Sequence, residues 1–155
     1  MGRVRRATEA DLGRIVELWV EMWRLHAGRD RRFEASPAAP AVVRSWIQGD
    51  LGDSRIAVLV AEEGGRVIGF ARAYLMENPP VVLETAFGYV SDLAVEAAAR
   101  GRGAGAELLK ACHDWLRGQG IKHVEVNVSI QNSEARSFYE RHGYSPFIDR
   151  LRAEL

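Results

Sequence analysis

Three glycines and two arginines are interleaved over six residues of this chain, Arg100-Gly101-Arg102-Gly103-Ala104-Gly105. They follow a predicted strand and open a predicted helix. Glycine leaves backbone N–H groups open to a ligand, and the amino end of a helix carries unpaired N–H groups with about half a positive charge. Arginine adds donors whose geometry suits phosphate oxygens. The segment therefore predicts a site for a phosphate-bearing ligand, and the other interpretation is a turn whose glycines only relax the chain.

Two common phosphate-binding patterns do not describe this segment. A Walker loop needs Gly-Lys-Ser/Thr, which is absent. Gly101, Gly103 and Ala106 match the spacing of a dinucleotide fingerprint and leave open a nucleotide-binding oxidoreductase, which NAD binding without CoA binding would favour. In that fingerprint the glycines follow the strand at once, and an acidic residue ends the next strand. Here five residues separate Val95 from Gly101, and the next strand ends near Asn127.

A second group of residues stands near the end of the chain: Asn132, Ala135, Phe138, Tyr139, Gly143 and Tyr144. This order of Asn, a small residue, an aromatic-Tyr pair and Gly-aromatic resembles the second cofactor motif of the GNAT superfamily of N-acetyltransferases. Arg100, Gly103 and Gly105 match that family's Arg/Gln-x-x-Gly-x-Gly/Ala signature for the acetyl-CoA pyrophosphate. The opening Arg-Arg-Ala-Thr-x-x-Asp, which ends at Asp11, is also similar, so the resemblance covers almost the whole chain.

The resemblance implies an enzyme that uses acetyl-CoA as co-substrate and acetylates a primary amine of a small molecule or peptide. The amine would attack directly in a ternary complex, without a metal ion. The pantetheine arm would pair with Leu93, Ala94 and Val95, and Asn132 would bind this arm or serve as a plain helix cap. The pyrophosphate would lie on Arg100, Gly101, Arg102, Gly103, Ala104 and Gly105. The alternative is a catalytically inactive acetyl-CoA-binding sensor or regulatory protein.

Acetyl transfer to an amine needs a neutral amine, a stabilised carbonyl oxygen and a stabilised or protonated leaving thiolate. The resemblance makes Tyr139 the candidate acid, facing the cofactor sulfur; a core aromatic is the other interpretation. A phenol with a pKa of about 10 donates to a thiolate whose thiol has a pKa of about 8.5 with only modest driving force. We therefore expect a hydrogen bond from Tyr139 that stabilises the leaving thiolate, without full proton transfer. A backbone N–H at the end of the strand Leu93–Val95, where it separates from its neighbour near Val126–Val128, is expected to meet the carbonyl.

The sequence leaves open which group removes the proton of the amine. An alkyl ammonium has a pKa of about 10, so its proton needs an acceptor. Asp92 within the central strand and Glu84 before it are the candidate catalytic carboxylates. A structural Asp92, a solvated Glu84 and a water chain are the alternatives. His26 has a suitable intrinsic pKa, and with Trp23 it is the candidate for the acceptor site, because first-helix residues commonly line that cleft in the family that the chain resembles.

The elements that must position these residues alternate between strands and helices. Period-two and continuous apolar runs predict strands, and apolar residues at helical spacing predict helices. The predicted strands are residues 3–6, 56–61, 67–75, 87–95, 124–128 and 147–155, and the predicted helices are residues 8–28, 42–51, 103–119 and 132–142. This order indicates an α/β (α+β) fold. By resemblance, a mixed and mostly antiparallel central sheet of six to seven strands, flanked by about four helices, would hold a splayed strand pair at the cofactor site.

Composition limits the partners that we expect. The 155 residues suit one domain, residues 1–155. Acidic and basic residues balance at 21 each, which gives no reason to expect nucleic acid or an anionic membrane as partner. Cys112 is the single cysteine, and we see neither a membrane-spanning run nor a secretory signal, so a cytoplasmic protein is expected. Relatives that pair through late strands suggest a homodimer.

Overall fold

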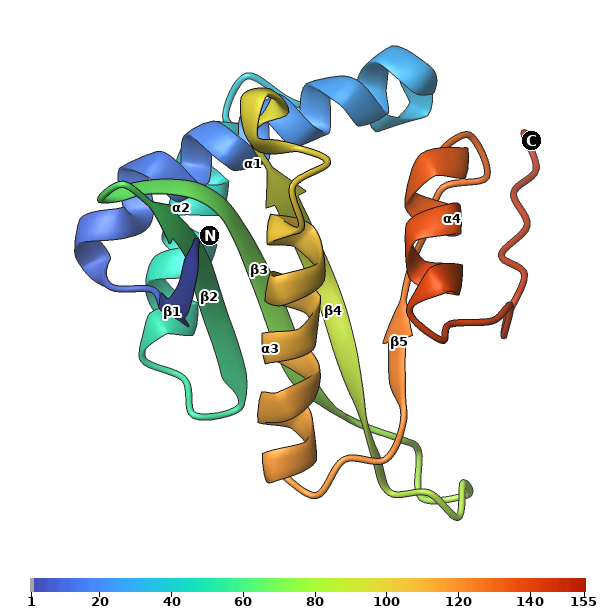
Figure 1. The fold of residues 1–155 in the computed structure, drawn as a ribbon. Helices are drawn as coiled ribbons and strands as arrows, with labels where there is room; N and C mark the ends of the chain where they lie inside the picture. The colour runs from blue at the N-terminus through green and yellow to red at the C-terminus, as the bar shows by residue number, and fades with distance from the viewer. Residues whose placement is uncertain (1) are drawn as a thin grey trace.

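The centre of the protein is a twisted sheet whose strands stand in the order β1-β2-β3-β4-β5 (Figure 1). The computed structural model describes residues 2–155. Its strands are β1 Arg3–Arg6, β2 Ile56–Glu63, β3 Arg66–Glu77, β4 Ala86–Val95 and β5 Val124–Val126. Strands β1 to β4 are antiparallel to their neighbours, whereas β5 is parallel to β4. The described residues therefore form the mixed, mostly antiparallel sheet that was predicted.

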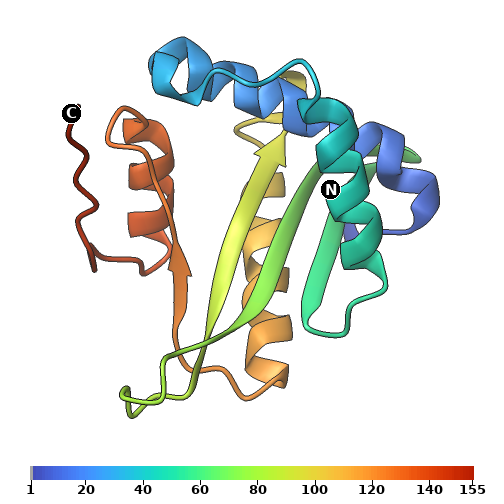
Figure 2. The same cartoon turned by 180° about the vertical axis from the view of Figure 1, so that it is seen from behind.

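Helices cover both faces of this sheet. Helices α1 Leu12–Arg29 and α2 Ala39–Leu51 lie behind the sheet in Figure 1 and in front of it in Figure 2, and α3 Ala104–Gly118 covers the opposite face. Helix α4 Ser133–Arg141 follows β5, and short 3-10 turns lie at Glu9–Asp11 (η1), Arg31–Phe33 (η2) and Ala97–Ala99 (η3). In the part of the chain that the structure describes, no helix is both long and apolar enough to cross a membrane.

The alternating side chains of the central strands fill two separate cores. Val58, Val60 and Phe70 pack against the buried apolar residues of α1 and α2. Their neighbours in sequence, including Leu59 and Ala71, pack instead against the apolar stripe of α3. Because successive side chains of a strand point to opposite faces, one pair of strands fixes both helix layers. This arrangement brings α1 and α3 to opposite sides of the end of β4.

Strand β4 carries a bulge at Ser91. Its register with β3 pairs Arg72 with Asp92 but Ala73 with Val90, so Ser91 is an extra residue on β4. Such a bulge interrupts the ladder and re-aims the side chains that follow it. Val90 belongs to the core under α3, whereas Asp92 lies on the opposite face, beside Arg72.

Strands β4 and β5 separate just beyond this bulge. They pair only from Gly88 to Val90, opposite Val124 to Val126. The last residues of β4, from Ser91 to Val95, therefore have no strand partner on that side within residues 2–155. This confirms the predicted splayed strand pair, at the position predicted for it.

The prediction of six to seven strands was wrong for the described chain, which has five. The strand predicted at residues 147–155 has no regular secondary structure. A strand needs a neighbouring strand to satisfy its backbone groups, and this segment finds none: it follows α4 and runs along the outer side of that helix, away from β4 (Figures 1 and 2). The sequence pattern fits a strand, but a pattern does not supply the partner.

Candidate functional site

The loop between β4 and α3 contains the predicted phosphate site. Gly101 has a φ of 75° and Gly103 a φ of 94°, values that residues with side chains rarely adopt. Gly103 is the N-cap of α3, and no side chain caps this helix. Within residues 2–155, none of the N–H groups of residues 101–106 donates to a backbone oxygen. Such a row of unpaired amides, at the positive end of a helix, suits an anion.

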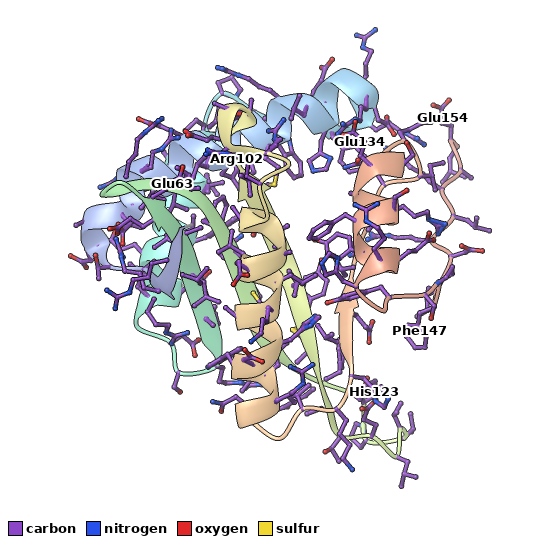
Figure 3. All side chains as sticks on the ribbon, in the orientation of Figure 1. Glu63, Arg102, His123, Glu134, Phe147 and Glu154 are labelled. Carbon is purple, nitrogen blue, oxygen red and sulfur yellow. The ribbon has the colours of Figure 1, made fainter. Side chains whose placement is uncertain are left out.

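The two arginines of this loop already have partners. Arg100 donates from Nε to the carbonyl oxygen of Val95 at 2.9 Å and from Nη2 to Glu21 at 3.2 Å. Arg102 donates to Glu63 at 3.0 Å, in front of the amino end of α3 (Figure 3). The side chains of Arg100 and Arg102 are 45% and 55% exposed. Ion pairs this exposed contribute about 0–1 kcal/mol, so a phosphate can replace these partners at little cost.

Helix α1 is tied to the same loop. Glu21 accepts from the N–H of Ala97 at 3.0 Å in addition to its bond with Arg100. About two turns earlier on α1, Arg14 donates to Glu96, which is buried. The predicted acceptor helix and the predicted phosphate loop are thus joined by side chains of Arg14 and Glu21.

The end of β4 presents its backbone to the open side of the sheet. The N–H of Glu96 donates to the carbonyl oxygen of Ile68 on β3 at 2.8 Å. Successive residues of a strand direct their N–H and C=O groups to alternate sides, so Leu93 and Val95 direct theirs away from β3. The carbonyl oxygen of Val95 indeed points away from β3, because it accepts a hydrogen bond from Arg100. The open edge therefore lies on residues to which the resemblance assigns the pantetheine arm.

Tyr139, on α4, belongs to the core cluster against which the side chains of Leu93 and Val95 pack. The residue is 8% exposed, and its ring packs edge-on against Phe138 and Tyr144 with ring centroids 5.2 Å apart in both pairs. Within residues 2–155, every side-chain nitrogen or oxygen atom that is buried from solvent has a hydrogen-bond partner. The Tyr139 hydroxyl has no such partner in this range, so it must reach solvent. Burial raises its pKa, with the charges of Cys112 and Asp92 adding to the effect, and the phenol stays protonated at neutral pH.

Asp92 belongs to a buried network that sequence reasoning missed. Arg72 on β3 donates from Nε to Asp92 Oδ2 at 2.6 Å and from Nη1 to Asp50 of α2 at 2.7 Å. Tyr74 donates to the same oxygen of Asp50 at 2.9 Å, and Ser91 donates to Asp92 Oδ2 at 2.8 Å. Arg72 and Asp92 are 6% and 7% exposed. The available signal was a single arginine in the otherwise apolar run of β3.

The charges of this network do not cancel. Arg72 supplies one positive charge to the two carboxylates of Asp50 and Asp92. Burial opposes the charge of Arg72, yet Asp92, Asp50 and Tyr74 together raise its pKa. Both bonds to Asp92 end on Oδ2, which leaves Oδ1 without a partner among the described residues and, by the argument used for Tyr139, open to solvent. The site therefore offers one carboxylate oxygen to a cationic ligand.

His26 and Trp23 form an aromatic wall with Phe33. The ring of Trp23 lies 5.7 Å from that of His26 and 6.0 Å from that of Phe33, both edge-on. Burial lowers the pKa of His26, the charge of Arg29 lowers it further, and the charge of Asp92 opposes both. His26 is therefore neutral at pH 7. Arg29, three residues further along α1, pairs with Glu134 of α4 at 3.3 Å, so this end of α1 lies beside the helix that carries Tyr139.

Asn132 and Glu84 lie differently with respect to this region. Asn132 is the N-cap of α4, and its Oδ1 accepts a hydrogen bond from the N–H of Ala135 at 3.1 Å. This is the helix-cap role that was the alternative to cofactor binding. The Nδ2 of Asn132 stays available to a ligand. Glu84 pairs with His123, at the far end of β4 (Figure 3). Glu84 lies two residues before β4, and the six residues of strand from Ala86 to Asp92, at about 3.3 Å each, add roughly 20 Å. The structure does not bring Glu84 to the group.

Cys112 lies inside α3 and is fully buried. Burial raises the pKa of its thiol to about 12, so it holds its proton at neutral pH and offers no nucleophilic thiolate. Over residues 2–155 there is no group of three or more His, Cys, Asp or Glu side chains placed to hold a metal ion. The candidate groups that remain are backbone amides, a phenol, an imidazole and a carboxylate.

Comparisons with known proteins agree with this arrangement. The model of the Acetyltransferase (GNAT) family matches residues 6–144. An uncharacterized N-acetyltransferase of Bacillus subtilis, YhfO, is 28% identical over 141 residues, which are 91% of this chain and 88% of that protein.

Solved structures share the fold. A tetramutant of the BH1408 protein of Bacillus halodurans has a TM-score of 0.90 at 22% identity, with 99% of each chain covered. The aminoglycoside N-acetyltransferase AAC(6')-Iy, in complex with CoA, has a TM-score of 0.82 at 15% identity, covering 100% of this chain and 95% of that one. Both likenesses support the architecture described above.

Replacing Arg72 tests how the network around Asp92 contributes to stability. Arg72→Met leaves two carboxylates near each other without their counterion, and we expect the free energy of unfolding to fall by about 3–5 kcal/mol. Arg55→Met is the matched control, because Arg55 pairs with Glu77 on the same sheet but is 54% exposed. Its loss is expected to stay below about 1 kcal/mol. Urea unfolding of both variants measures the difference, and equal losses would contradict this account of the network.

Proposed function

Because the chain belongs to the GNAT family of acetyltransferases, we propose that it moves the acetyl group of acetyl-CoA to a primary amine of a small molecule or peptide. One observation carries the proposal: the unpaired amides of residues 101–106 follow the open backbone edge of Leu93 and Val95, and Tyr139, whose hydroxyl has no partner, belongs to the core cluster against which these two residues pack. An elongated diphosphate whose arm ends in a thioester fits this sequence of groups.

The chain binds the donor mainly through its backbone. The amides of residues 101–106 hold the diphosphate, and Arg100 and Arg102 exchange their surface partners for phosphate oxygens. Leu93 and Val95 pair with the amides of the pantetheine arm as a neighbouring strand would. Asn132 adds its Nδ2. Bound in this way, acetyl-CoA supplies a thioester carbonyl as electrophile and a thiolate as leaving group.

The residues near the bulge support the chemical step. A backbone N–H at the end of β4 donates to the carbonyl oxygen of the thioester, where negative charge develops. Tyr139 donates a hydrogen bond from its protonated hydroxyl to the sulfur. Its raised pKa makes full proton transfer to a thiolate unfavourable, so the contribution of Tyr139 is the hydrogen bond itself.

The acceptor amine enters from the side of α1. Asp92 Oδ1 binds the incoming ammonium group, and Arg72 fixes the carboxylate in place. His26 is neutral at pH 7 and takes the proton that the amine loses before it attacks. Trp23 and Phe33 provide apolar surface and rings that suit a bulky or cationic acceptor. AAC(6')-Iy is an aminoglycoside N-acetyltransferase, and aminoglycosides are therefore one class of acceptor to test.

The phosphate loop is tested by Gly103→Val. The side chain disfavours the left-handed backbone at φ 94°, which aligns the amides of the loop. We expect the Kd for CoA, measured by calorimetry, to rise at least about tenfold, or about 1.4 kcal/mol. Gly65→Val is the matched control, since Gly65 has a φ of 77° and equally open surroundings in the β2–β3 turn. The proposal fails if the protein does not bind CoA or if both variants bind it equally well.

Tyr139→Phe separates an enzyme from a protein that only binds acetyl-CoA. Loss of a hydrogen bond made to the leaving sulfur is expected to lower kcat by about 10²–10³-fold, with an unchanged Kd for CoA. Thiol release over a panel of amines, aminoglycosides included, measures the rate. Tyr144→Phe removes a hydroxyl from the same cluster, one that binds His113, and is expected to keep most of the activity. Absence of thiol release with every amine would favour the regulatory alternative.

The dependence of kcat/KM on pH tests His26. Protonated His26 cannot accept a proton, so activity is lost as pH falls through its pKa, which burial holds below the ordinary value of about 6.5. We expect the rate to rise with pH below about 6.5 and this limb to disappear in His26→Gln. His123→Gln, at the far end of β4, is expected to retain it. A limb that survives in His26→Gln would assign the proton to water or another residue.

A further inference from the structure

A row of three polar side chains crosses the sheet on the face of α1 and α2. The strand register pairs Tyr74 of β3 with Tyr89 of β4, and it pairs Tyr89 with Glu125 of β5. Side chains of paired residues lie on the same face of a sheet, and the hydroxyl of Tyr74 binds Asp50 of α2. The valines on both sides of Glu125 pack against the core beneath α3, so Glu125 points to the opposite face. Figure 2 views this face and shows no helix of residues 2–155 in front of β5.

Asp92 lies on the same face, next to this row. Its partner Arg72 precedes Tyr74 by two residues on β3, which is about 6.7 Å of strand. Glu125 lies one strand further than Tyr89, at a spacing of about 4.8 Å. Because these two steps are perpendicular, the backbones of Asp92 and Glu125 are separated by roughly 8 Å. One small molecule can therefore contact both carboxylates.

Both carboxylates have room for a cation. Asp92 is more than nine-tenths buried, yet its Oδ1 has no partner within residues 2–155. Glu125 is half-buried, and its side chain makes no hydrogen bond or ion pair in the same range. Arg72 is already shared between Asp50 and Asp92, so it does not neutralise both of them. A buried carboxylate oxygen without a partner is costly, and a cationic ligand removes that cost.

Tyr89 neighbours both carboxylates on this face. Its hydroxyl accepts a hydrogen bond from Nδ2 of Asn127 at 3.1 Å, which leaves the hydroxyl proton for a ligand. Burial raises the pKa of Tyr89, the charge of Asp92 raises it further and that of Glu125 adds to the effect, against Asn127 and Arg150. The phenol is therefore neutral at pH 7. Arg150 forms no ion pair with either carboxylate within residues 2–155. The ring of Tyr89 thus offers an apolar surface between two anionic groups, which suits a short methylene chain that carries positive charge.

We infer that Glu125 and Tyr89 bind a second ammonium group of the acceptor, which makes the acceptor a short aliphatic diamine. An extended chain advances about 1.2 Å per bond, so about five carbon atoms between the two nitrogens match the separation of Asp92 and Glu125. The inference rests on the proposed function, because it names the acceptor of that site. The amine at Asp92 loses its proton to His26 and forms the amide bond as the C–S bond of the thioester breaks. The amine at Glu125 keeps its proton and leaves without an acetyl group.

Glu125 distinguishes a diamine from other amines of the same length by charge. The second ammonium group makes a charge-assisted hydrogen bond with this carboxylate. A monoamine places a methyl group there and gains no such bond. An amino acid of the same length places a second carboxylate against Glu125, and this like-charge contact opposes its binding. Glu125 therefore acts as a specificity-determining residue, and it takes no part in the chemical step.

Acetylation of two amines of equal length tests the inference. The kcat/KM for 1,5-diaminopentane, measured by thiol release, is expected to exceed that for pentylamine at least about tenfold. Glu125→Gln is expected to lower this ratio at least about tenfold, mainly through a higher KM for the diamine. Glu77→Gln is the matched control, because Glu77 is a glutamate of the same sheet that is 73% exposed and pairs with Arg55. This control should keep the ratio.

The possible failures of this experiment are distinguishable. Equal kcat/KM values for the two amines in the unchanged protein overturn the diamine inference while acetyl transfer stands. A ratio that Glu125→Gln leaves unchanged has the same meaning. Absence of thiol release with every amine overturns the proposed function, and the inference with it.

Reversing the charge at Glu125 gives a result that misfolding cannot produce. In Glu125→Lys the second position carries a positive charge, so 6-aminohexanoate, which ends in a carboxylate, should become a better acceptor than 1,5-diaminopentane. Calorimetry with CoA-saturated protein measures the same reversal as a change in the two Kd values, without turnover. An order of preference that Glu125→Lys leaves unchanged would show that this residue does not contact the second group of the acceptor, and it would overturn the inference.

Discussion

The site depends on the interruption of backbone pairing between β4 and β5. A sheet normally satisfies the N–H and C=O groups of its strands from both sides, and unsatisfied groups are costly unless water or a ligand binds them. Here the pairing stops at Val90, and Leu93 and Val95 are left with one open side. The amides of the loop that follows are equally unpaired. The protein thus keeps a continuous line of backbone donors and acceptors outside its own hydrogen-bond network, so a ligand can complete it.

The bulge at Ser91 gives this open edge a second property. One extra residue in β4 reverses the face on which the following side chains lie, and it puts Asp92 beside Arg72 on the face of α1 and α2. In a regular strand, Ser91 would pair with Arg72, and Asp92 would pair with Ala71 and face the apolar core beneath α3. In the function that we propose, the same local irregularity leaves backbone groups open for acetyl-CoA and positions a carboxylate for the amine. A charged group this deeply buried is retained only with a partner, which explains why Arg72 must lie in the middle of β3.

Some of this arrangement could be predicted from sequence, and the reasons are physical. Gly101 and Gly103 need no tertiary information, because their spacing before a helix predicts open amides by itself. The role of Tyr139 came from family resemblance and stays a proposal, supported by its free hydroxyl. The bulge and the bond between Arg72 and Asp92 depend on strand register, which no local pattern specifies. Glu84 was grouped with Asp92 because both are near β4 in sequence. An extended strand is long, however, and more than half of β4 lies between the two residues. The strand at residues 147–155 was expected because charged and apolar residues alternate there. The described residues contain no strand with which this segment pairs.

Glu21 has a consequence for how the two substrates influence each other. This α1 carboxylate accepts hydrogen bonds from both the N–H of Ala97 and the side chain of Arg100. Trp23 and His26 follow it on the same helix, within about one and a half turns. A ligand that draws Arg100 away from Glu21 leaves this carboxylate without its counterion, next to the surface that we propose for the amine. Such coupling works in both directions: if the first ligand changes the affinity for the second by some factor, the second changes the affinity for the first by the same factor. In the function that we propose, Glu21 therefore couples the binding of acetyl-CoA at Arg100 to the binding of the amine beside α1.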